Sequence, residues 1–489
     1  MYASWNGTQA FIMPSLKLLS PGRLIVLLAG VQILSLVGFP YIFSSAPPID
    51  VVEGLVWAPH WLIGTYKHPP LPAWIIEIFV TLTRDVIFGP YLAAQLAVAL
   101  TYFFVYRLGR LIMDPMRAAA GTALIAASYY FTVPTFEFNH NVIQLPLWAG
   151  TIFIYARIRR EPSLFMNWIF LGLICGIGLY AKYSFALLIG ILLIASLIES
   201  SMRSIWASRG PYSAMLIALI IFAPHLTWLI THNFEPFFYL ADRADSPTAS
   251  APLWFLGAQL ADHLPLIVPL LFVGFASLKS AQASSADKQD RLFLWLMTFA
   301  PVFLTLLFAV ITNSRIKDMW GMAMFTPLGL LIVMQLGRAW SIVMVRRVAF
   351  ASCGLIMLVG IGFALHSHFI FGGATPRTNW PMRAIASEAQ SVWKASTSKP
   401  LAIIGGTPWI AGLAVVETPL RNSMIIGDTL DHSPWIAIDD VRTKGALFLF
   451  SGDRQTAPKL CAGSVTRSIL AVQGPDKQPL TAFVCLPSS

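Results

Sequence analysis

Long apolar runs recur through the first three quarters of the chain, and they constrain its fold more than any other feature. A run of about 20 apolar residues can cross a bilayer as a helix, because a helix satisfies its backbone polar groups internally. About eleven runs qualify, if short or tilted ones are included. They cover residues 24–44, 86–106, 117–134, 141–157, 165–181, 183–199, 212–231, 262–278, 292–312, 319–337 and 348–369. The runs predict a polytopic α-helical membrane protein.

Composition agrees with this prediction. Charged residues make up 11% of the 489 residues, whereas about a quarter of the residues in soluble domains are charged. The net charge of +10 does not indicate a nucleic-acid partner, because most Lys and Arg residues lie at the ends of apolar runs. The first 20 residues lack the order of regions found in a cleaved signal, so residues 24–44 are expected to be a retained span.

The distribution of Lys and Arg predicts the orientation. With the N-terminus inside, most cations fall in inner loops, as the positive-inside rule requires. The outer loops hold Lys67, Arg84, Lys182, Arg243, Arg315 and Lys317. An odd number of spans then places the C-terminal segment outside.

The chain changes character after the last apolar run. Residues 373–489 have ordinary polarity and short β-like runs such as "LAIIGG" and "ALFLF" between helix-like stretches. We therefore expect two domains, a membrane domain over residues 1–372 and a small outer α/β domain over residues 373–489. Cys461 and Cys485 lie in the second domain, where an oxidising compartment would allow a disulfide, although two free thiols also fit the sequence.

The first outer loop, residues 45–85, is rich in ionisable and aromatic side chains. Asp50 and Glu53 are three residues apart and would share one face of a helix. We expect two short helices along the membrane surface, joined at "KHPP", where tandem prolines prevent helix continuation and hold Lys67 and His68 on a rigid elbow. For Glu77 and Asp85 we prefer a simpler interpretation as solvated loop charges.

A second loop, "TFEFNHNVIQ", packs polar groups between two apolar runs more densely than a turn needs. Its candidate site residues are Glu137, Asn139, His140 and Asn141. Helix capping is a good alternative role for Asn141 and a poorer one for Glu137 and His140. Lys182–Tyr183 and the stretch "NSRIKDMW", with Arg315 and Lys317, add cations at the same surface, where a phosphate-bearing lipid would account for them.

Five stretches in order resemble the bacterial members of the protein O-mannosyltransferase superfamily, which includes the lipid A aminoarabinose and galacturonic acid transferases. They are "DVVEGLVW" with "GTYKHPPLPAW", then "FNHNVIQLPLWAG", "GLYAKYSFALL", "PHLTWLITHNF" and "SRIKDMWGMAMFTPLG". The resemblance spans roughly residues 40–335. It implies the GT-C fold, with a helical membrane body, outer juxtamembrane helices and a soluble outer domain.

The resemblance also implies an activity, the transfer of a sugar from a polyprenyl phosphate to a lipid, glycan or protein acceptor at the periplasmic face of the bacterial inner membrane. Asp50 matches the acidic residue that such enzymes use as catalytic base, and Glu53 matches a second acidic position. Many relatives have Asp-Glu where this chain has Asp50-Val51, and Lys directly before the prolines where it has His68. Asp50 is therefore expected to be the sole base. No cofactor is certain, and a divalent metal is possible.

Other membrane functions were weighed against this interpretation. A transporter would also be polytopic, but transporters usually place their polar groups near mid-membrane and show paired repeats, whereas the ionisable residues here collect at one surface. A phosphoethanolamine or acyl transferase would need a recognisable nucleophile or a His/Asp metal cluster, and neither spacing is evident. Displacement by an acceptor hydroxyl, with cations on the departing phosphate, fits the clustered residues better.

Overall fold

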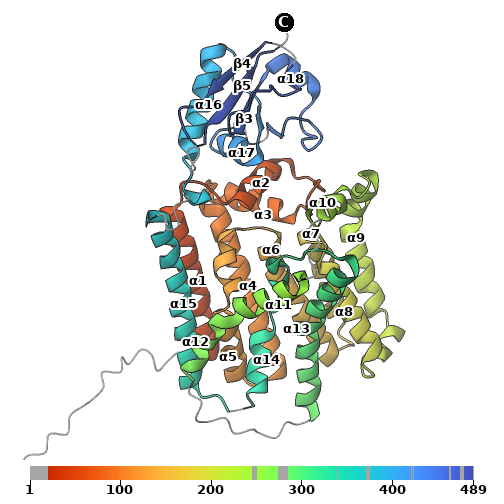
Figure 1. The fold of residues 1–489 in the computed structure, drawn as a ribbon. Coiled ribbons are helices and arrows are strands. Elements are labelled where there is room, and N and C mark those ends of the chain that lie inside the picture. Colours follow the sequence, from red (N-terminus) through yellow and green to blue (C-terminus); the bar gives the residue numbers. More distant parts are fainter. Residues whose placement is uncertain are drawn as a thin grey trace, which may run out of the picture.

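The computed structural model has a helical body with a mixed α/β unit at one end (Figure 1). The structure describes residues 20–244, 250–273, 285–337, 339–369, 375–419, 421, 423–461, 464–473 and 478–487. The helices of the body, with two outer helices among them, are α1 (Pro21–Phe43), α2 (Ile49–Trp57), α3 (Leu71–Thr83), α4 (Phe88–Ile112), α5 (Pro115–Ile125), α6 (His140–Arg160), α7 (Phe165–Ala181), α8 (Phe185–Ile198), α9 (Gly210–Thr231), α10 (Glu235–Ala244), α11 (Ala251–His263), α12 (Ile267–Leu271), α13 (Ser285–Thr312), α14 (Leu328–Gln335) and α15 (Ile342–Phe369).

Six helical segments among the described residues are long and apolar enough to cross a membrane, so the chain is a multi-pass membrane protein. They are α1, α4, α9, the α11–α12 segment Ala251–Leu271, α13 and α15. Two other runs, α7 and α8, form shorter apolar helices. The count of about eleven spans stays a prediction.

Three of the predicted spans are not continuous helices. The run 117–134 is helical only to Ile125 and then continues as short 3₁₀ turns, Tyr129–Phe131 and Val133–Phe136. The run 262–278 overlaps a helix that begins earlier, at Ala251, and is interrupted by a 3₁₀ turn at Leu264–Leu266; residues 274–278 lie outside the described residues. In the run 319–337 the helix begins only at Leu328. Pro134, Pro265 and Pro327 lie in these non-helical stretches, and each lacks a backbone N–H donor.

Polar side chains buried between α1 and α4 hold the 3₁₀ segment in place. Gln32 donates from Nε2 to the carbonyl oxygen of Phe131 (2.8 Å) and to Oε1 of Gln95 (2.8 Å). Gln95 in turn donates to the carbonyl oxygen of Thr135 (3.0 Å), and the hydroxyl of Tyr102 donates to Gln32 (3.1 Å). Because these buried groups satisfy one another, the segment leading to Glu137 has a defined position.

The first outer loop forms two short helices, as predicted. Helix α2 begins directly after Pro48, and α3 begins at Leu71, with Pro70 at its N-cap. "KHPP" lies immediately before α3. The hydroxyl of Thr65 accepts from the backbone N–H groups of Lys67 (3.3 Å) and His68 (3.1 Å) and donates to the carbonyl oxygen of His68 (2.8 Å), which closes the elbow.

The α/β unit contains one five-stranded sheet in the order β2-β1-β3-β5-β4. Strands β2, β1 and β3 pair in parallel, whereas β5 pairs antiparallel with both β3 and β4. Leu447 and Leu449 pack with α16 and α17 on one face, and Phe448 and Phe450 face α18 on the other, as the period of a strand requires. The elements are α16 (Met382–Ser396), β1 (Ile404–Gly406), α17 (Pro408–Val416), β2 (Met424–Ile426), α18 (Ile438–Lys444), β3 (Ala446–Ser451), β4 (Val465–Ile469) and β5 (Leu480–Cys485).

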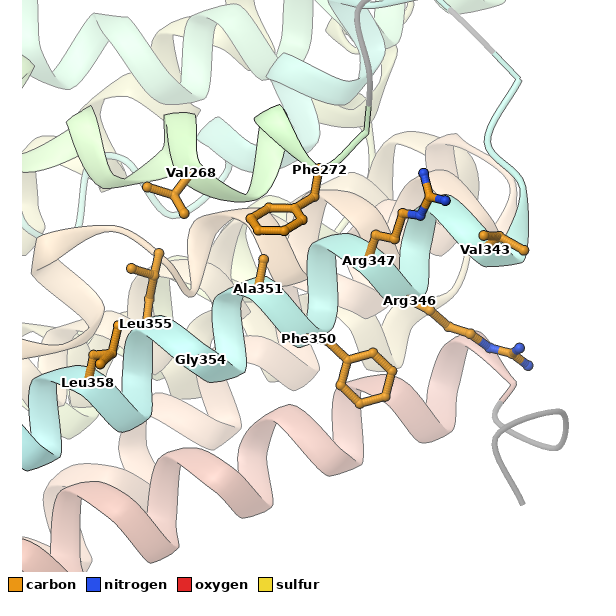
Figure 2. A pocket seen from close by; sticks show the side chains of 10 residues that line it. All are labelled: Val268, Phe272, Val343, Arg346, Arg347, Phe350, Ala351, Gly354, Leu355 and Leu358. Carbon is orange, nitrogen blue, oxygen red and sulfur yellow. The ribbon is translucent and has the colours of Figure 1, made fainter. Parts of the chain in front are cut away.

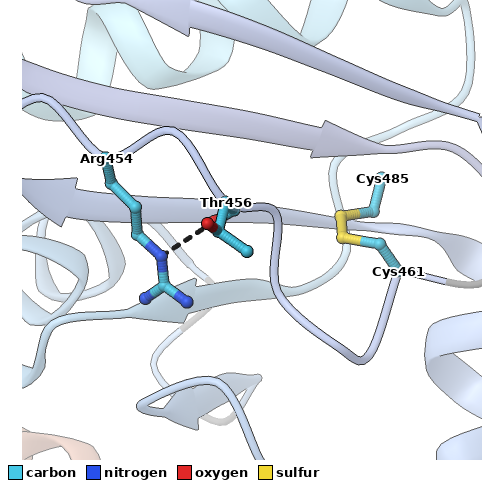
Figure 3. Close-up of a disulfide and its surroundings, with 4 residues drawn as sticks. All are labelled: Arg454, Thr456, Cys461 and Cys485. Atoms are coloured by element: carbon cyan, nitrogen blue, oxygen red, sulfur yellow. Dashed lines mark hydrogen bonds between the residues drawn. A yellow bond between two sulfur atoms is a disulfide. The ribbon is translucent and has the colours of Figure 1, made fainter.

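A disulfide joins Cys461 to Cys485 at the end of β5 (Figure 3). Their Cα atoms are 5.1 Å apart, which is within the usual range for a disulfide. Arg454, in the loop before Cys461, donates to the carbonyl oxygen of Thr456 (2.9 Å) and to Asp428 (2.7 Å). The loop is thus fixed to the sheet at both ends. Of the two possibilities that the sequence left open, the structure has the disulfide.

The α/β unit packs directly on the outer helices. Helix α17 lies against α2, where Gly412 contacts Val52. Arg421 donates to both carboxylate oxygens of Glu77 on α3, at 2.9 and 3.0 Å. The interpretation of Glu77 as a solvated loop charge is therefore wrong, because this carboxylate is largely buried against the α/β unit. The predicted domain boundary, between residues 372 and 373, lies outside the described residues and stays a prediction.

Asp85 also has a structural role that the sequence interpretation missed. Its Oδ1 atom accepts from the backbone N–H groups of Ile87 and Phe88, both at 2.8 Å. These groups begin α4 and would otherwise lack partners. Asp85 therefore fixes the turn that leads into α4, and it is not simply a solvated charge.

Candidate active site

Asp50 lies in the first turn of α2. There it contacts the loop "TFEFNHNVIQ", residues 135–144. Its Oδ2 accepts a hydrogen bond from the amide of Asn139 (3.0 Å), and its backbone N–H donates to Oε1 of Glu137 (2.6 Å). Two loops almost ninety residues apart are thus joined at one carboxylate pair. The contact leaves the other side of Asp50 facing a cavity.

That cavity, of about 250 Å³, combines carboxylates with cations. Asp50 and Glu137 lie on its wall together with Lys67, Arg315 and Lys317. The lining is completed by His68, His140, Tyr239, Met319 and Trp320. Since an anion-binding group and a candidate base share one chamber, a phosphate ester and a nucleophile could bind side by side.

The KHPP elbow contributes one cation and one imidazole. Lys67 makes an ion pair with Glu53 (2.7 Å), and its ammonium lies 5.6 Å from the ring centre of Tyr239. Burial is the largest single influence and lowers the pKa of Lys67, but the charge and hydrogen bond of Glu53, with smaller contributions from Tyr239 and Asp50, together raise the pKa overall. His68 lies against His140, with ring centres 4.0 Å apart. Lys67 is therefore kept charged at the cavity wall.

Hydrogen bonds from two buried side chains hold the stretch that contains Arg315 and Lys317. The hydroxyl of Tyr130 donates to the carbonyl oxygen of Asp318 (2.7 Å), and Gln259 donates to the same oxygen (3.1 Å). At Gly321 a Cβ would come within 2.1 Å of the Gln259 side chain, so only glycine fits there without displacing this amide. Both cations are exposed toward the cavity.

Lys182 stands behind the cavity lining. Its ammonium donates to the side-chain oxygen of Asn141 (2.6 Å) and lies 5.7 Å from the ring centre of Trp320. Burial and, after it, the positive charge of Lys317 lower the pKa of Lys182 to about 7. An anion placed between the two cations would favour the charged form of Lys182.

Glu137 is a buried carboxyl with a strongly raised pKa. Burial and then the nearby charge of Asp50 raise its pKa to about 7. The short contact from the Asp50 backbone N–H acts in the opposite direction without cancelling this shift. Glu137 is therefore protonated more readily than an exposed carboxyl would be.

Twelve site residues were predicted from the sequence. Some line the cavity, and others contact the residues that line it. Asp50, Lys67, His68, Glu137, His140, Arg315 and Lys317 lie on the wall. Glu53, Asn139, Asn141 and Lys182 contact wall residues or one another without lining the cavity. Tyr183 lies further away, where its hydroxyl is 3.0 Å from Nε2 of His225, whose Nδ1 is 2.6 Å from the carbonyl oxygen of Ile63.

One capping role was assigned to the wrong residue. Asn139, not Asn141, caps α6, because its side-chain oxygen accepts from the backbone N–H groups of Asn141 (2.9 Å) and Val142 (3.3 Å). Three wall residues were also missed, Tyr239, Met319 and Trp320. Met319 and Trp320 follow the predicted cations directly, whereas nothing in the local sequence around Tyr239 points to the cavity.

A bound divalent metal would need a cluster of donor side chains. Within the described ranges, no group of three or more His, Cys, Asp and Glu side chains is arranged to hold a metal ion.

A protein-family model matches a segment in the first half of the chain. Residues 67–228 match the family model described as dolichyl-phosphate-mannose-protein mannosyltransferase. The matched segment is less than half of the chain. It contains the KHPP elbow, the Glu137 loop and Lys182, and the remaining wall residues lie on either side of it.

Curated relatives agree with this match. The lipopolysaccharide core galacturonosyltransferase RgtA of Rhizobium johnstonii is 28% identical over 42% of this chain and 41% of its own length. An undecaprenyl phosphate-alpha-4-amino-4-deoxy-L-arabinose arabinosyl transferase of Pseudomonas fluorescens is 27% identical over 49% of this chain and 46% of its own. The chain thus spans less than half the length of these two relatives. RgtB of Rhizobium johnstonii is 25% identical over 72% of this chain and 73% of its own length.

The fold has a solved counterpart. The crystal structure of ArnT from Cupriavidus metallidurans bound to undecaprenyl phosphate superposes with a TM-score of 0.61, covering 94% of this chain and 97% of that chain at 14% identity. The similarity extends over both the helical body and the α/β unit. The GT-C fold expected from the sequence is therefore the fold of this protein.

Proposed function

We propose that this protein is an inverting glycosyltransferase that moves a sugar from a polyprenyl phosphate to a lipid, glycan or protein acceptor. The observation that supports it most is the shared cavity, where Asp50 lies on the same wall as Lys67, Arg315 and Lys317. A transferase needs both a base for the acceptor and cations for the leaving phosphate. The named activities of the curated relatives point to the same class of reaction.

In the proposed reaction Asp50 takes the proton of the acceptor hydroxyl. The acceptor oxygen forms a bond to the anomeric carbon while the bond from that carbon to the phosphate oxygen breaks. Direct displacement inverts the anomeric centre. The hydrogen bond from Asn139 to Oδ2 holds the Asp50 carboxylate in one orientation, which favours attack from a single direction.

The electron pair of the breaking bond leaves with the polyprenyl phosphate. Lys67, Arg315 and Lys317 neutralise the charge that develops on this phosphate, and Lys182 supplies a further cation once an anion draws its pKa upward. Because the pKa of Glu137 is raised, its protonation would reduce the negative charge beside the donor.

The site would face the periplasm of a bacterial inner membrane. The bias of Lys and Arg toward the opposite side of the membrane supports this orientation, as does a disulfide in the unit that covers the site. Membrane lipids surround the helical body, and the donor would enter from the bilayer.

A strain lacking the gene tests the proposal. Mass spectrometry of its lipid A, hopanoid, polysaccharide and glycoprotein fractions should reveal one product without a sugar, and wild-type protein should restore it. Asp50→Asn, expressed to the same level in the membrane, should not. If no fraction loses a sugar when the gene is removed, the proposed function is wrong.

A further inference from the structure

A groove runs along α15 at the opposite end of the helical body from the candidate active site. It lies between α12 and α15 and has a volume of about 600 Å³ (Figure 2). Its walls are apolar, with Val268 of α12 facing Leu355 of α15 and Phe272, directly after α12, facing Ala351. At Gly354 a Cβ would meet no atom within 4 Å, so the absence of a side chain there deepens the groove.

Two adjacent arginines close one end of this groove. Arg346 and Arg347 project from the beginning of α15, and both line the groove (Figure 2). The Nε atom of Arg346 is buried and has no hydrogen-bond partner among the described residues. A ligand in the groove would therefore meet the terminal guanidinium nitrogens of the two arginines and not this buried atom.

The charge pattern indicates which ligand fits. The apolar length of the groove matches an acyl chain, but every lipid-facing helix surface does so, and this alone would not select a ligand. The paired guanidinium groups at one end add a requirement for a negative charge at headgroup depth. The bias of Lys and Arg places this end of α15 at the inner membrane surface, where anionic headgroups are available.

We propose that the groove is a binding site for an anionic diacyl phospholipid of the inner leaflet. Its phosphate lies at the end of the groove that Arg346 and Arg347 line. One acyl chain follows α15 past Phe350 and over Gly354. The site does not overlap the candidate active-site cavity, so the inference stands whether or not the proposed transfer reaction is correct.

Native mass spectrometry of the full chain tests this assignment. Purified protein is stripped of lipid and titrated with phosphatidylglycerol or with phosphatidylethanolamine of the same acyl chains. Wild type should bind one phosphatidylglycerol in preference to phosphatidylethanolamine. Arg346→Gln/Arg347→Gln should weaken phosphatidylglycerol binding roughly 30-fold, since each cation near the surface contributes about 1 kcal/mol.

Two further variants separate the groove from general surface charge. Gly354→Phe keeps both arginines but fills the groove, and it should also abolish preferential binding. The matched control, Arg110→Gln/Arg209→Gln, removes two exposed cations elsewhere and should bind as wild type does. Equal phosphatidylglycerol affinity in both arginine double variants, or equal binding of the two lipids by wild type, would overturn the assignment.

Discussion

At the scale of single residues, Asp50 bears the greatest part of the proposed chemistry. Asp50→Asn preserves the side-chain shape and can still accept the hydrogen bond from Asn139. We expect transfer by purified enzyme to fall roughly 10²- to 10⁴-fold, the usual contribution of a general base. Binding of a polyprenyl phosphate, measured by native mass spectrometry, should not change.

The control for this experiment is Asp439→Asn, which alters an exposed carboxylate of α18. Near-wild-type turnover by Asp50→Asn would exclude Asp50 as the base, and Glu53 would be tested next. Glu77→Gln, an obvious choice from the sequence, is not a neutral control because Glu77 binds Arg421.

Arg315 is expected to act on the donor rather than on the acceptor. A charge-assisted hydrogen bond to phosphate contributes about 1.5–3 kcal/mol, so Arg315→Gln should lower kcat/KM for the lipid-linked donor roughly 10- to 100-fold. The KM for the acceptor should stay as it is. Lys459→Gln, at an exposed position of the α/β unit, is the matched control, and an unchanged donor dependence would contradict this role.

Glu137 should make stability depend on pH. Because its pKa is raised from about 4.5 to about 7, the folded protein binds this proton more tightly than the unfolded chain does. The resulting stabilisation is present below pH 4.5 and is lost as pH rises toward 7. Glu137→Gln keeps the acceptor for the Asp50 backbone N–H and should melt a few degrees higher than wild type at pH 8, with no difference near pH 4.5. A constant difference across this range in a thermal-shift assay would show that Glu137 is not the titrating group.

At the scale of elements, the 3₁₀ segment before Glu137 depends on amides buried in the helical body. Gln95→Leu removes the donor to Thr135 and leaves buried acceptors without a partner, which costs about 1–3 kcal/mol. We expect a lower melting temperature together with reduced transfer, because the segment carrying Glu137 is no longer fixed.

Thr227→Val serves as the control for this change. The Thr227 hydroxyl bonds only within its own helix, to the carbonyl oxygen of Ala223 (3.0 Å), at an exposed position. It should have little effect on stability or transfer. If Gln95→Leu also has little effect, the buried network does not position the site.

The positions of helices could be predicted from the sequence, but their interruptions could not. Apolar runs identify α1, α4, α9, α13 and α15 because hydrophobicity and length are local properties. The same runs continue through the 3₁₀ turns at Tyr129–Phe131 and Leu264–Leu266. Gln32 of α1 bonds to the carbonyl oxygen of Phe131 in the first turn, and Pro265 lies in the second. Hydrophobicity records neither feature.

The candidate site was partly predictable for a related reason. Asp50, Lys67 and Arg315 stand out because charged residues are rare beside apolar runs. Tyr239 was missed, since one tyrosine in an amphipathic helix has no local signature. Asn139 caps α6, whereas Asn141 binds Lys182. This difference depends on the backbone conformation at each position, and two nearby Asn residues look alike in the sequence.

At the scale of the whole molecule, the Arg421–Glu77 pair joins two segments that are 344 residues apart. Nothing in either local sequence identifies the other. Arg421→Gln leaves the Glu77 carboxylate largely buried without its cation, which is destabilising. We expect faster hydrogen–deuterium exchange in α3, over residues Leu71–Thr83, together with lower thermal stability.

Two controls accompany this variant. Lys444→Gln breaks an exposed pair within α18 and should leave exchange in α3 unchanged. Exchanging the charges, with Glu77→Arg and Arg421→Glu together, should restore part of the protection. Unaltered exchange in Arg421→Gln would show that the α/β unit docks without this pair.

Two ring stacks between the α/β unit and the first outer loop bear on how the protein is made. His432 lies against Tyr66, with ring centres 3.8 Å apart, and Trp435 lies 4.3 Å from His60. During translation, His60 and Tyr66 emerge from the ribosome several hundred residues before the partners that cover them. The loop that contains Lys67 therefore lacks these contacts until His432 and Trp435 have been synthesised. A ribosome stalled before residue 430 would hold an inserted but unfinished enzyme, and the timing of activity would follow the delivery of the last segment across the membrane.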